Sequence, residues 1–384
     1  MKTLFLTAAL LCTGLIFSNQ KNNFDANKQG CFVENPSNGS IQVALLLDTS
    51  NSMDGLINQA KSRLWNIVNT LTTLKYEGKT PQIEIALYEY GNSGLSQQSD
   101  YIRQVVGLTR DLDLISEHLF ALHTNGGLEY CGAVLKDATY KLDWNADNKG
   151  MKLIYIAGNE PFNQGSVNYK EAIADAQKKG IFINTIFCGN KEEGIRTFWK
   201  DGADIGQGKY FNIDSNARIQ YIVTPYDQPI TICNQQLNST YISYGRQGYL
   251  KKENQTMQDV NAESLSGANY AERVVSKSKA VYSNESWDLV DKVKTQPNAI
   301  AELKEEELPA ELKGKSNAEI KDFVEAKTKV REKIQKEIAV LAKKRQDFID
   351  AEMKKTEAQD DLGNAIVASI QEFAKVKGYK IEKR

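Results

Sequence analysis

The stretch that most constrains the fold of this chain is residues 41–53, where a mostly apolar run stops at an acid and two hydroxyls. Residues 41–47 have the length and composition of a buried strand, and beyond Asp54 the apolar residues recur at helical spacing. Asp48, Ser50 and Ser52 are therefore expected where a strand ends and a helix begins. In an open α/β sheet this position faces the crevice in which ligands bind. Oxygen donors of this kind suit a hard cation, Mg²⁺ or Ca²⁺.

Predicted strands and helices alternate from about residue 40 to about residue 230. This alternation predicts parallel βαβ units and an α/β fold with a doubly wound, mostly parallel sheet. A short edge strand is expected to return at 101–108, and a helix at 217–223 is expected to close the block. The other strands are predicted at 41–47, 83–88, 152–157, 181–187 and 209–213.

The Asp-x-Ser-x-Ser pattern of Asp48, Ser50 and Ser52 resembles the first motif of the metal-ion-dependent adhesion site in von Willebrand factor type A (VWA) domains. Thr124, in a loop before a helix, matches the second motif. The resemblance covers residues 38–230 and implies a VWA-like, Rossmann-like fold. It also implies a cation held by the two serines and Thr124, with Asp48 orienting its waters. An acidic group of a protein partner would be the last ligand.

The third motif departs from the pattern of these domains. Pro161 fixes the register of the loop that follows the strand at 152–157, and Gly158 then stands where the resemblance implies an aspartate. Gly158 can neither hold metal-bound water nor offset the charge of a cation. Asn159 and Glu160 are expected to compensate in part, because outer oxygens help to orient metal ligands. We therefore expect an incomplete site that is weaker or altered, and the sequence does not distinguish Mg²⁺ from Ca²⁺.

The alternative for these hydroxyls is structural, because serine and threonine commonly cap helices and brace turns. Asp48 separates the two interpretations. An acid at the end of an apolar strand is costly unless it is paired, hydrogen-bonded or beside a cation. Two further acids, Asp54 and Glu129, are expected to serve helix N-termini.

The N-terminal segment has the pattern of an export signal. Lys2 precedes an apolar run, and residues 1–18 are interpreted as a signal peptide, with an uncleaved anchor as the alternative. Residues 19–37 are polar and form a linker. No later segment has the roughly 20 apolar residues of a membrane helix. A net charge of −1 and the lack of a basic stretch argue against nucleic acid as a partner. We expect an exported protein of the periplasm, cell envelope or extracellular space.

Four cysteines follow the signal segment, and an even number in an exported chain favours disulfides. Cys31 precedes the first strand and Cys233 follows the last helix of the α/β region, so we predict that these two pair. Cys131 follows one loop at the site end of the sheet and Cys188 ends a strand there, so we predict a second bond between them. The alternative is that Cys131 and Cys188 are buried thiols.

Beyond a connecting segment at 231–254, residues 255–384 are rich in Ala, Lys and Glu and predict a helical, coiled-coil-like tail. Ser316 and Glu319 form a capping box that opens a long amphipathic run. Charged residues interrupt its apolar stripe, so a hairpin or bundle of long helices is expected, with the last helix at 362–373 folding back on it. Such a tail would serve as a spacer or self-association module.

Three classes of function remain after these observations. The leading hypothesis is an exported VWA-like protein that binds another protein through a cation at the top of its sheet. The second is a structural envelope protein with a vestigial metal site, whose helical tail drives assembly. An enzyme is the least favoured reading. The chain has only His118 and His123 as histidines and shows neither a nucleophile elbow nor a phosphate-binding loop.

Overall fold

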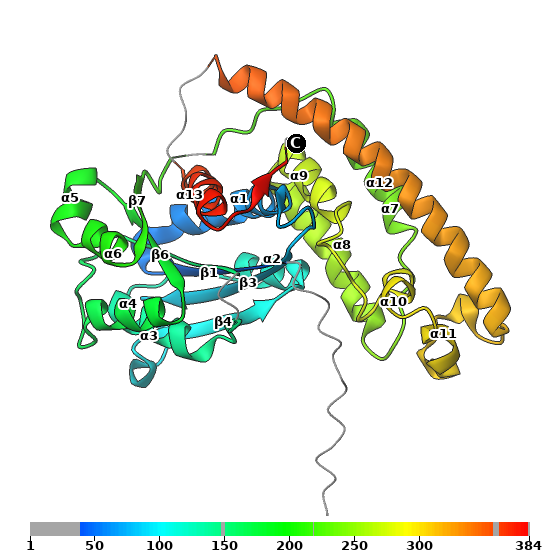
Figure 1. The fold of residues 1–384 in the computed structure, drawn as a ribbon, viewed down its shortest axis with the longest axis horizontal. Helices are drawn as coiled ribbons and strands as arrows, with labels where there is room; N and C mark the ends of the chain where they lie inside the picture. Colours follow the sequence, from blue (N-terminus) through cyan, green and yellow to red (C-terminus); the bar gives the residue numbers. More distant parts are fainter. Residues whose placement is uncertain (1–38, 147–149, 218, 356–360, 383–384) are drawn as a thin grey trace, which may run out of the picture. The chain divides into compact units, whose positions relative to one another are not determined.

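The computed structural model describes residues 39–146, 150–217, 219–355 and 361–382. Its centre is a six-stranded sheet with the order β4-β3-β1-β5-β6-β7 (Figure 1). All neighbouring strands are parallel except β3 and β4, which are antiparallel. The predicted doubly wound, mostly parallel α/β sheet is thus confirmed. The strands are β1 (Ser40–Asp48), β3 (Gln82–Tyr90), β4 (Ile102–Thr109), β5 (Met151–Gly158), β6 (Ile181–Cys188) and β7 (Gln207–Ile213).

Strand β1 shows why this sheet needs helices on both faces. Val43, Leu45 and Leu47 belong to one apolar cluster, and the intervening Ala44 and Leu46 belong to another. Because side chains alternate along a strand, β1 is buried on both sides. One face is covered by α1 (Asp54–Leu71), α2 (Leu112–Phe120) and α13 (Leu362–Val376), and the other by α3 (Cys131–Lys141), α4 (Tyr169–Lys178) and α6 (Trp199–Ile205). The short α5 (Lys191–Arg196) precedes α6.

Helix α13 packs on the sheet, whereas the sequence predicts that a helix at 217–223 is the last one of the α/β block. Residue 217 and residues 219–223 are not helical. Instead α13 packs on α1 and on β5 to β7. Its Ser369 hydroxyl accepts a hydrogen bond from Tyr155 at 3.1 Å, and its Phe373 ring lies 4.7 Å from Phe182. The expectation that the last helix folds back on the long helix is wrong, because its apolar side belongs to the core of the sheet.

The helical region between β7 and α13 is built around one long helix, α12 (Asn317–Met353). The predicted capping box of Ser316 and Glu319 opens it. It packs on α7 and α10, and the described residues contain no second helix of comparable length, so the predicted hairpin of long helices is not formed. The other helices are α7 (Asp227–Asn238), α8 (Gly248–Leu265), α9 (Gly267–Lys277), α10 (Leu289–Thr295) and α11 (Ala299–Glu302).

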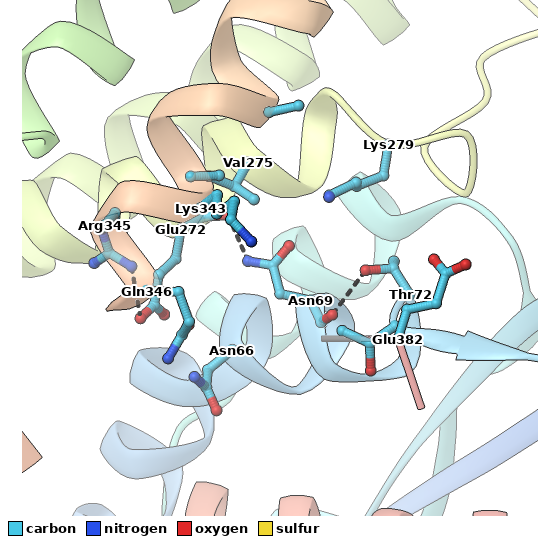
Figure 2. A pocket seen from close by; sticks show the side chains of 13 residues that line it. Asn66, Asn69, Thr72, Glu272, Val275, Lys279, Lys343, Arg345, Gln346 and Glu382 are labelled. Atoms are coloured by element: carbon cyan, nitrogen blue, oxygen red, sulfur yellow. Dashed lines mark hydrogen bonds and ion pairs between the residues drawn. The ribbon is translucent and has the colours of Figure 1, made fainter. Parts of the chain in front are cut away.

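Polar contacts fix the helical region to α1. Asn69 of α1 donates a hydrogen bond from Nδ2 to the carbonyl oxygen of Glu272 at 2.9 Å. The carboxylate of Glu272 lies 3.6 Å from the Arg345 guanidinium of α12. Figure 2 shows these side chains around a hollow of about 150 Å³. The end of α1 is also tied to the C-terminal segment, since β2 (Leu74–Lys75) pairs with β8 (Lys380–Ile381).

The cysteines do not form the predicted bond within the sheet domain. Cys131 and Cys188 are buried free thiols, and the buried Cys233 is bonded to neither of them. Cys131 belongs to the apolar cluster on one face of the sheet and Cys188 to the cluster on the other, so the sheet separates them. The predicted Cys31–Cys233 bond involves Cys31, which lies outside the described residues, as do the signal segment and the linker. Within the described ranges, no helix has both the length and the apolar character needed to cross a bilayer.

Candidate metal centre

Asp48 is the last residue of β1 and is fully buried. Its Oδ1 accepts a hydrogen bond from the backbone N–H of Ser50 at 2.7 Å, at the point where the strand ends. Its Oδ2 is also buried and has no hydrogen-bond partner among the described residues. An oxygen of this kind is costly unless a donor or a cation satisfies it.

Two predicted hydroxyls and Asn159 meet beside this carboxylate. The hydroxyl oxygens of Ser50 and Ser52 lie 3.2 Å apart. Asn159, just after β5, donates from Nδ2 to the hydroxyl of Ser52 at 3.2 Å. This leaves the Oδ1 of Asn159 buried and without a partner in the described part of the chain. Ser50, Ser52 and Asn159 thus lie together at the end of β1.

Thr124 lies in the neighbouring loop, but its hydroxyl takes a different partner. It donates to the carboxylate of Asp54, which is in the first turn of α1 as predicted. The backbone N–H of Asn125 donates to the carbonyl of Thr49 at 2.9 Å and holds this loop against the first one. The structure therefore brings the loop of Thr124 to the site, with the hydroxyl itself bonded to Asp54.

Tyr90 gives a physical reason for the glycine in the third loop. A Cβ atom at Gly158 would lie 2.5 Å from the Tyr90 hydroxyl oxygen and 3.1 Å from Asp48 Oδ2. The hydroxyl is held there because it donates to the carbonyl of Ala157 at 3.0 Å. Any side chain at position 158 would therefore require Tyr90 to move.

Glu129 is a site residue that the sequence analysis missed. Helix α3 begins at Cys131 and has no acid in its first turn, so the expected role of Glu129 at a helix terminus is wrong. Its side chain is instead buried against Asp48. A Cβ atom added at Gly91 would lie 2.6 Å from Glu129 Cγ and 2.9 Å from Asp48 Oδ1, so both side chains converge on this glycine. In the sequence, the position of Glu129 between two large apolar residues, Leu128 and Tyr130, is the feature that could have indicated a buried acid.

The electrostatics of this acid pair are unusual for a protein interior. Neither Asp48 nor Glu129 takes part in an ion pair among the described residues, and Glu129 Oε2 lacks a hydrogen-bond partner there. Burial, together with the charge of Asp48, raises the pKa of Glu129 to about 9. Burial likewise raises the pKa of Asp48 to about 6, and Glu160 adds further negative charge. The pair therefore requires a positive charge, either a proton or a cation.

The donor set fits a hard divalent cation. Three buried oxygens lack partners in the described structure, on Asp48, Glu129 and Asn159, and they accompany the hydroxyls of Ser50 and Ser52. Carboxylate, amide and hydroxyl oxygens are the ligands that Mg²⁺ and Ca²⁺ prefer. The described residues hold no group of three or more His, Cys, Asp or Glu side chains suited to a metal. A cation here would thus rely on neutral oxygens as well as on carboxylates.

Comparison with known proteins bears on the sheet region. Residues 42–225 match the family model of the von Willebrand factor type A domain. A search of curated proteins finds no match. Among solved structures, BatB from Bacteroides thetaiotaomicron is 16% identical, with 46% of this chain and 91% of that chain covered and a TM-score of 0.35. A von Willebrand factor type A protein from Catenulispora acidiphila is 17% identical, with 46% and 39% covered and a TM-score of 0.35.

A third similar structure is proximal thread matrix protein 1 from the mussel byssus, which is 14% identical with a TM-score of 0.34. The match covers 45% of this chain and 41% of the mussel protein, so the chain spans less than half of that relative. The family match and the six-stranded sheet agree in extent, since the matched residues run from β1 to the segment after β7. Residues 42–225, which span the sheet from β1 to β7, thus match the von Willebrand factor type A domain.

Proposed function

We propose that this protein binds another protein through a divalent cation, Mg²⁺ or Ca²⁺, held at the carboxyl end of β1. The supporting observation is the buried, unpartnered Oδ2 of Asp48 beside the hydroxyls of Ser50 and Ser52. In this proposal Ser50, Ser52 and Thr124 hold the cation and Asp48 orients its waters. An acidic group of the partner supplies the last ligand.

The bound cation would supply a Lewis-acidic point of attachment for an oxygen of the partner. The chain's own residues fix the donors before binding. The Ser50 N–H holds Asp48 in place, Asn159 holds the hydroxyl of Ser52, and the contact between Asn125 and Thr49 keeps the second loop over the first. Donors fixed in this way lose little conformational entropy on binding. We propose a binding protein and not an enzyme.

The proposal places the protein outside the cytoplasm, in the periplasm, the cell envelope or the extracellular space. Its support is the cationic and apolar pattern of residues 1–18. Self-association would use the helical region, in which α12 carries the exposed apolar residues Val330 and Val340. Both parts can be tested separately, by fractionation of the native host and by sedimentation of the purified protein.

The test of the binding mechanism is calorimetric titration of the purified protein with MgCl₂ and with CaCl₂, before and after Asp48→Ala. The native protein should bind at least one cation, and Asp48→Ala should abolish binding while circular dichroism shows an intact fold. Crosslinked capture from the native envelope, in Mg²⁺ and in chelator, should then recover a partner only with the cation. Absence of cation binding by the native protein would overturn the mechanism.

A further inference from the structure

We infer that Glu129 supplies the second carboxylate of the cation site, in place of the acid that the third loop lacks, so that the cation is held before any partner arrives. This inference rests on the cation binding proposed above. It assigns to Glu129 a ligand role that neither its position in the sequence nor the three motifs of the domain indicate. It also changes what a partner must contribute.

Position 158 is closed to an acidic side chain in this protein. Tyr90 is fully buried, and its hydroxyl lies where a side chain at Gly158 would begin. The same hydroxyl donates to the carbonyl of Ala157, directly before the glycine. Position 158 therefore has neither an acid nor the space for one, so a second carboxylate ligand must come from another position.

Glu129 reaches Asp48 from the second loop. This loop is fixed by close backbone contacts, because a Cβ atom at Gly127 would lie 2.0 Å from the carbonyl oxygen of Gly91. The N–H of Glu129 donates to the side-chain oxygen of Gln164 at 3.0 Å. Gly91 and Gly127 thus allow the loop after β3 to touch the loop that carries Glu129. This contact directs the Glu129 side chain to Asp48. Five per cent of Glu129 is exposed.

The local charges separate a ligand role from a packing role. A buried acid that only packs would be expected to have an Arg or Lys partner or full hydrogen bonding, because an unsatisfied charge is costly. Glu129 has no Arg or Lys partner among the described residues, its Oε2 lacks a hydrogen bond there unless a proton is shared with Asp48, and its nearest charged neighbour is another acid. Two carboxylates balance the charge of one divalent cation. The cation can therefore be held by the chain alone, and the partner's acidic group adds to a site that is already neutral.

Glu160 is a second acid near the site against which Glu129 can be compared. It lies two residues after Gly158, and its charge acts on both Asp48 and Glu129. It is more exposed than Glu129, and none of its side-chain oxygens is buried without a partner. If the site only needed negative charge nearby, Glu129 and Glu160 would be equivalent. A ligand role predicts that Glu129 matters far more.

The experiment is calorimetric titration of the metal-free full chain with MgCl₂, and electron paramagnetic resonance titration with Mn²⁺, each without a partner. The native protein should bind in both assays. Glu129→Gln should weaken binding roughly 100-fold, at the upper end of what loss of one supporting group costs, and Glu160→Gln, which removes a charge beside the ligands, should weaken it about tenfold at most. Glu129→Asp keeps the charge on a shorter side chain and should fall between. Thermal unfolding in chelator shows whether each variant is folded.

The outcomes separate this inference from the proposed function. Unchanged affinity in Glu129→Gln would overturn the ligand role while the binding mechanism stands. So would native protein that binds Mg²⁺ only when acetate is added as a substitute for the partner's acid. A native protein that binds no cation with or without acetate would remove both. Equal losses of cation affinity in Glu129→Gln and Glu160→Gln would show that only the negative charge near the site matters. This result would also overturn the inference.

Discussion

Two sets of buried acidic side chains differ in whether a cationic side chain pairs with them. In the helical region Asp259 lies 2.6 Å from the guanidinium of Arg273 and 2.8 Å from the ammonium of Lys277. At the carboxyl end of the sheet, Asp48 and Glu129 face each other, and neither has an ion-pair partner among the described residues. Asp48, Glu129 and Asp259 are each at most 5% exposed, so burial does not explain the difference.

The difference indicates which buried charges serve the fold and which serve binding. Although burial raises it, the pKa of Asp259 is held well below its usual range by the charges of Lys277 and Arg273. The pKa values of Asp48 and Glu129 are raised instead. An acid in an ion pair stabilises the native state. An acid without a cationic partner can instead form its ion pair with a bound ligand. Each prediction below tests one side of this comparison.

The largest effect is expected where a paired acid loses its cation. Arg331 of α12 is buried and lies 2.6 Å from Asp288 and 3.0 Å from Asp291. Arg331→Met leaves both acids without it and should lower the free energy of unfolding by about 3–5 kcal/mol. Urea denaturation measures this loss. Lys329→Met on the same helix removes an exposed partner of Glu325 and should cause no measurable change. Equal stability of the two variants would show that the buried pairs do not hold the helical region.

The next effect is expected from restoring the acid that the third loop lacks. Gly158→Asp introduces a side chain 2.5 Å from the Tyr90 hydroxyl and beside the carboxylate of Asp48. Without metal it should destabilise the protein by about 2–3 kcal/mol, the upper range for overpacking a core. Urea denaturation in chelator measures the loss, and adding Tyr90→Phe should recover part of it. A stable Gly158→Asp single variant would contradict the claim that Tyr90 closes this position.

Local pattern was enough to predict the first loop and the sheet. The strand before Asp48 and the helix after Asp54 follow from apolar spacing, and residues 40 to 213 contain the six expected strands. Two features were not predictable in this way. Glu129 reaches Asp48 because Gly127 packs on Gly91, which is a contact between loops distant in sequence.

The second feature is α13, which covers the sheet although more than a hundred residues separate it from β7. Its apolar spacing predicted a helix but could not say which surface that helix would cover. Ile366 and Ile370 are fully buried in the sheet's own cluster, on the side of α1. Periodicity gives the face of a helix and not its partner, so the helical region was assigned to a separate tail.

At the metal site, removing an acid is expected to raise the free energy of unfolding when no metal is present. Glu129→Gln removes one of two facing acids and introduces an N–H that can donate to Asp48. In chelator this variant should be more stable than the native protein by about 2 kcal/mol, because relieving an unsatisfied buried group returns its desolvation cost. Saturating Mg²⁺ should reverse the order, since only the native protein gains the binding energy of the cation. A loss of stability in chelator would place Glu129 among the structural acids.

The smallest expected effect tests how completely Asp259 offsets the burial of Lys277 in the helical region. Burial lowers the pKa of Lys277 to about 8 even though Asp259 adjoins it. Because the folded pKa lies below the unfolded value of 10.5, the unfolded state binds more protons between the two values and stability rises with pH. From about pH 7 to about pH 9 the native protein should gain about 1 kcal/mol relative to Lys277→Met. Urea denaturation at several pH values measures the difference between the two proteins, in which shared titrations cancel. Parallel stability curves would mean that Asp259 fully offsets the burial of Lys277, and that the two regions differ more sharply than the pKa values indicate.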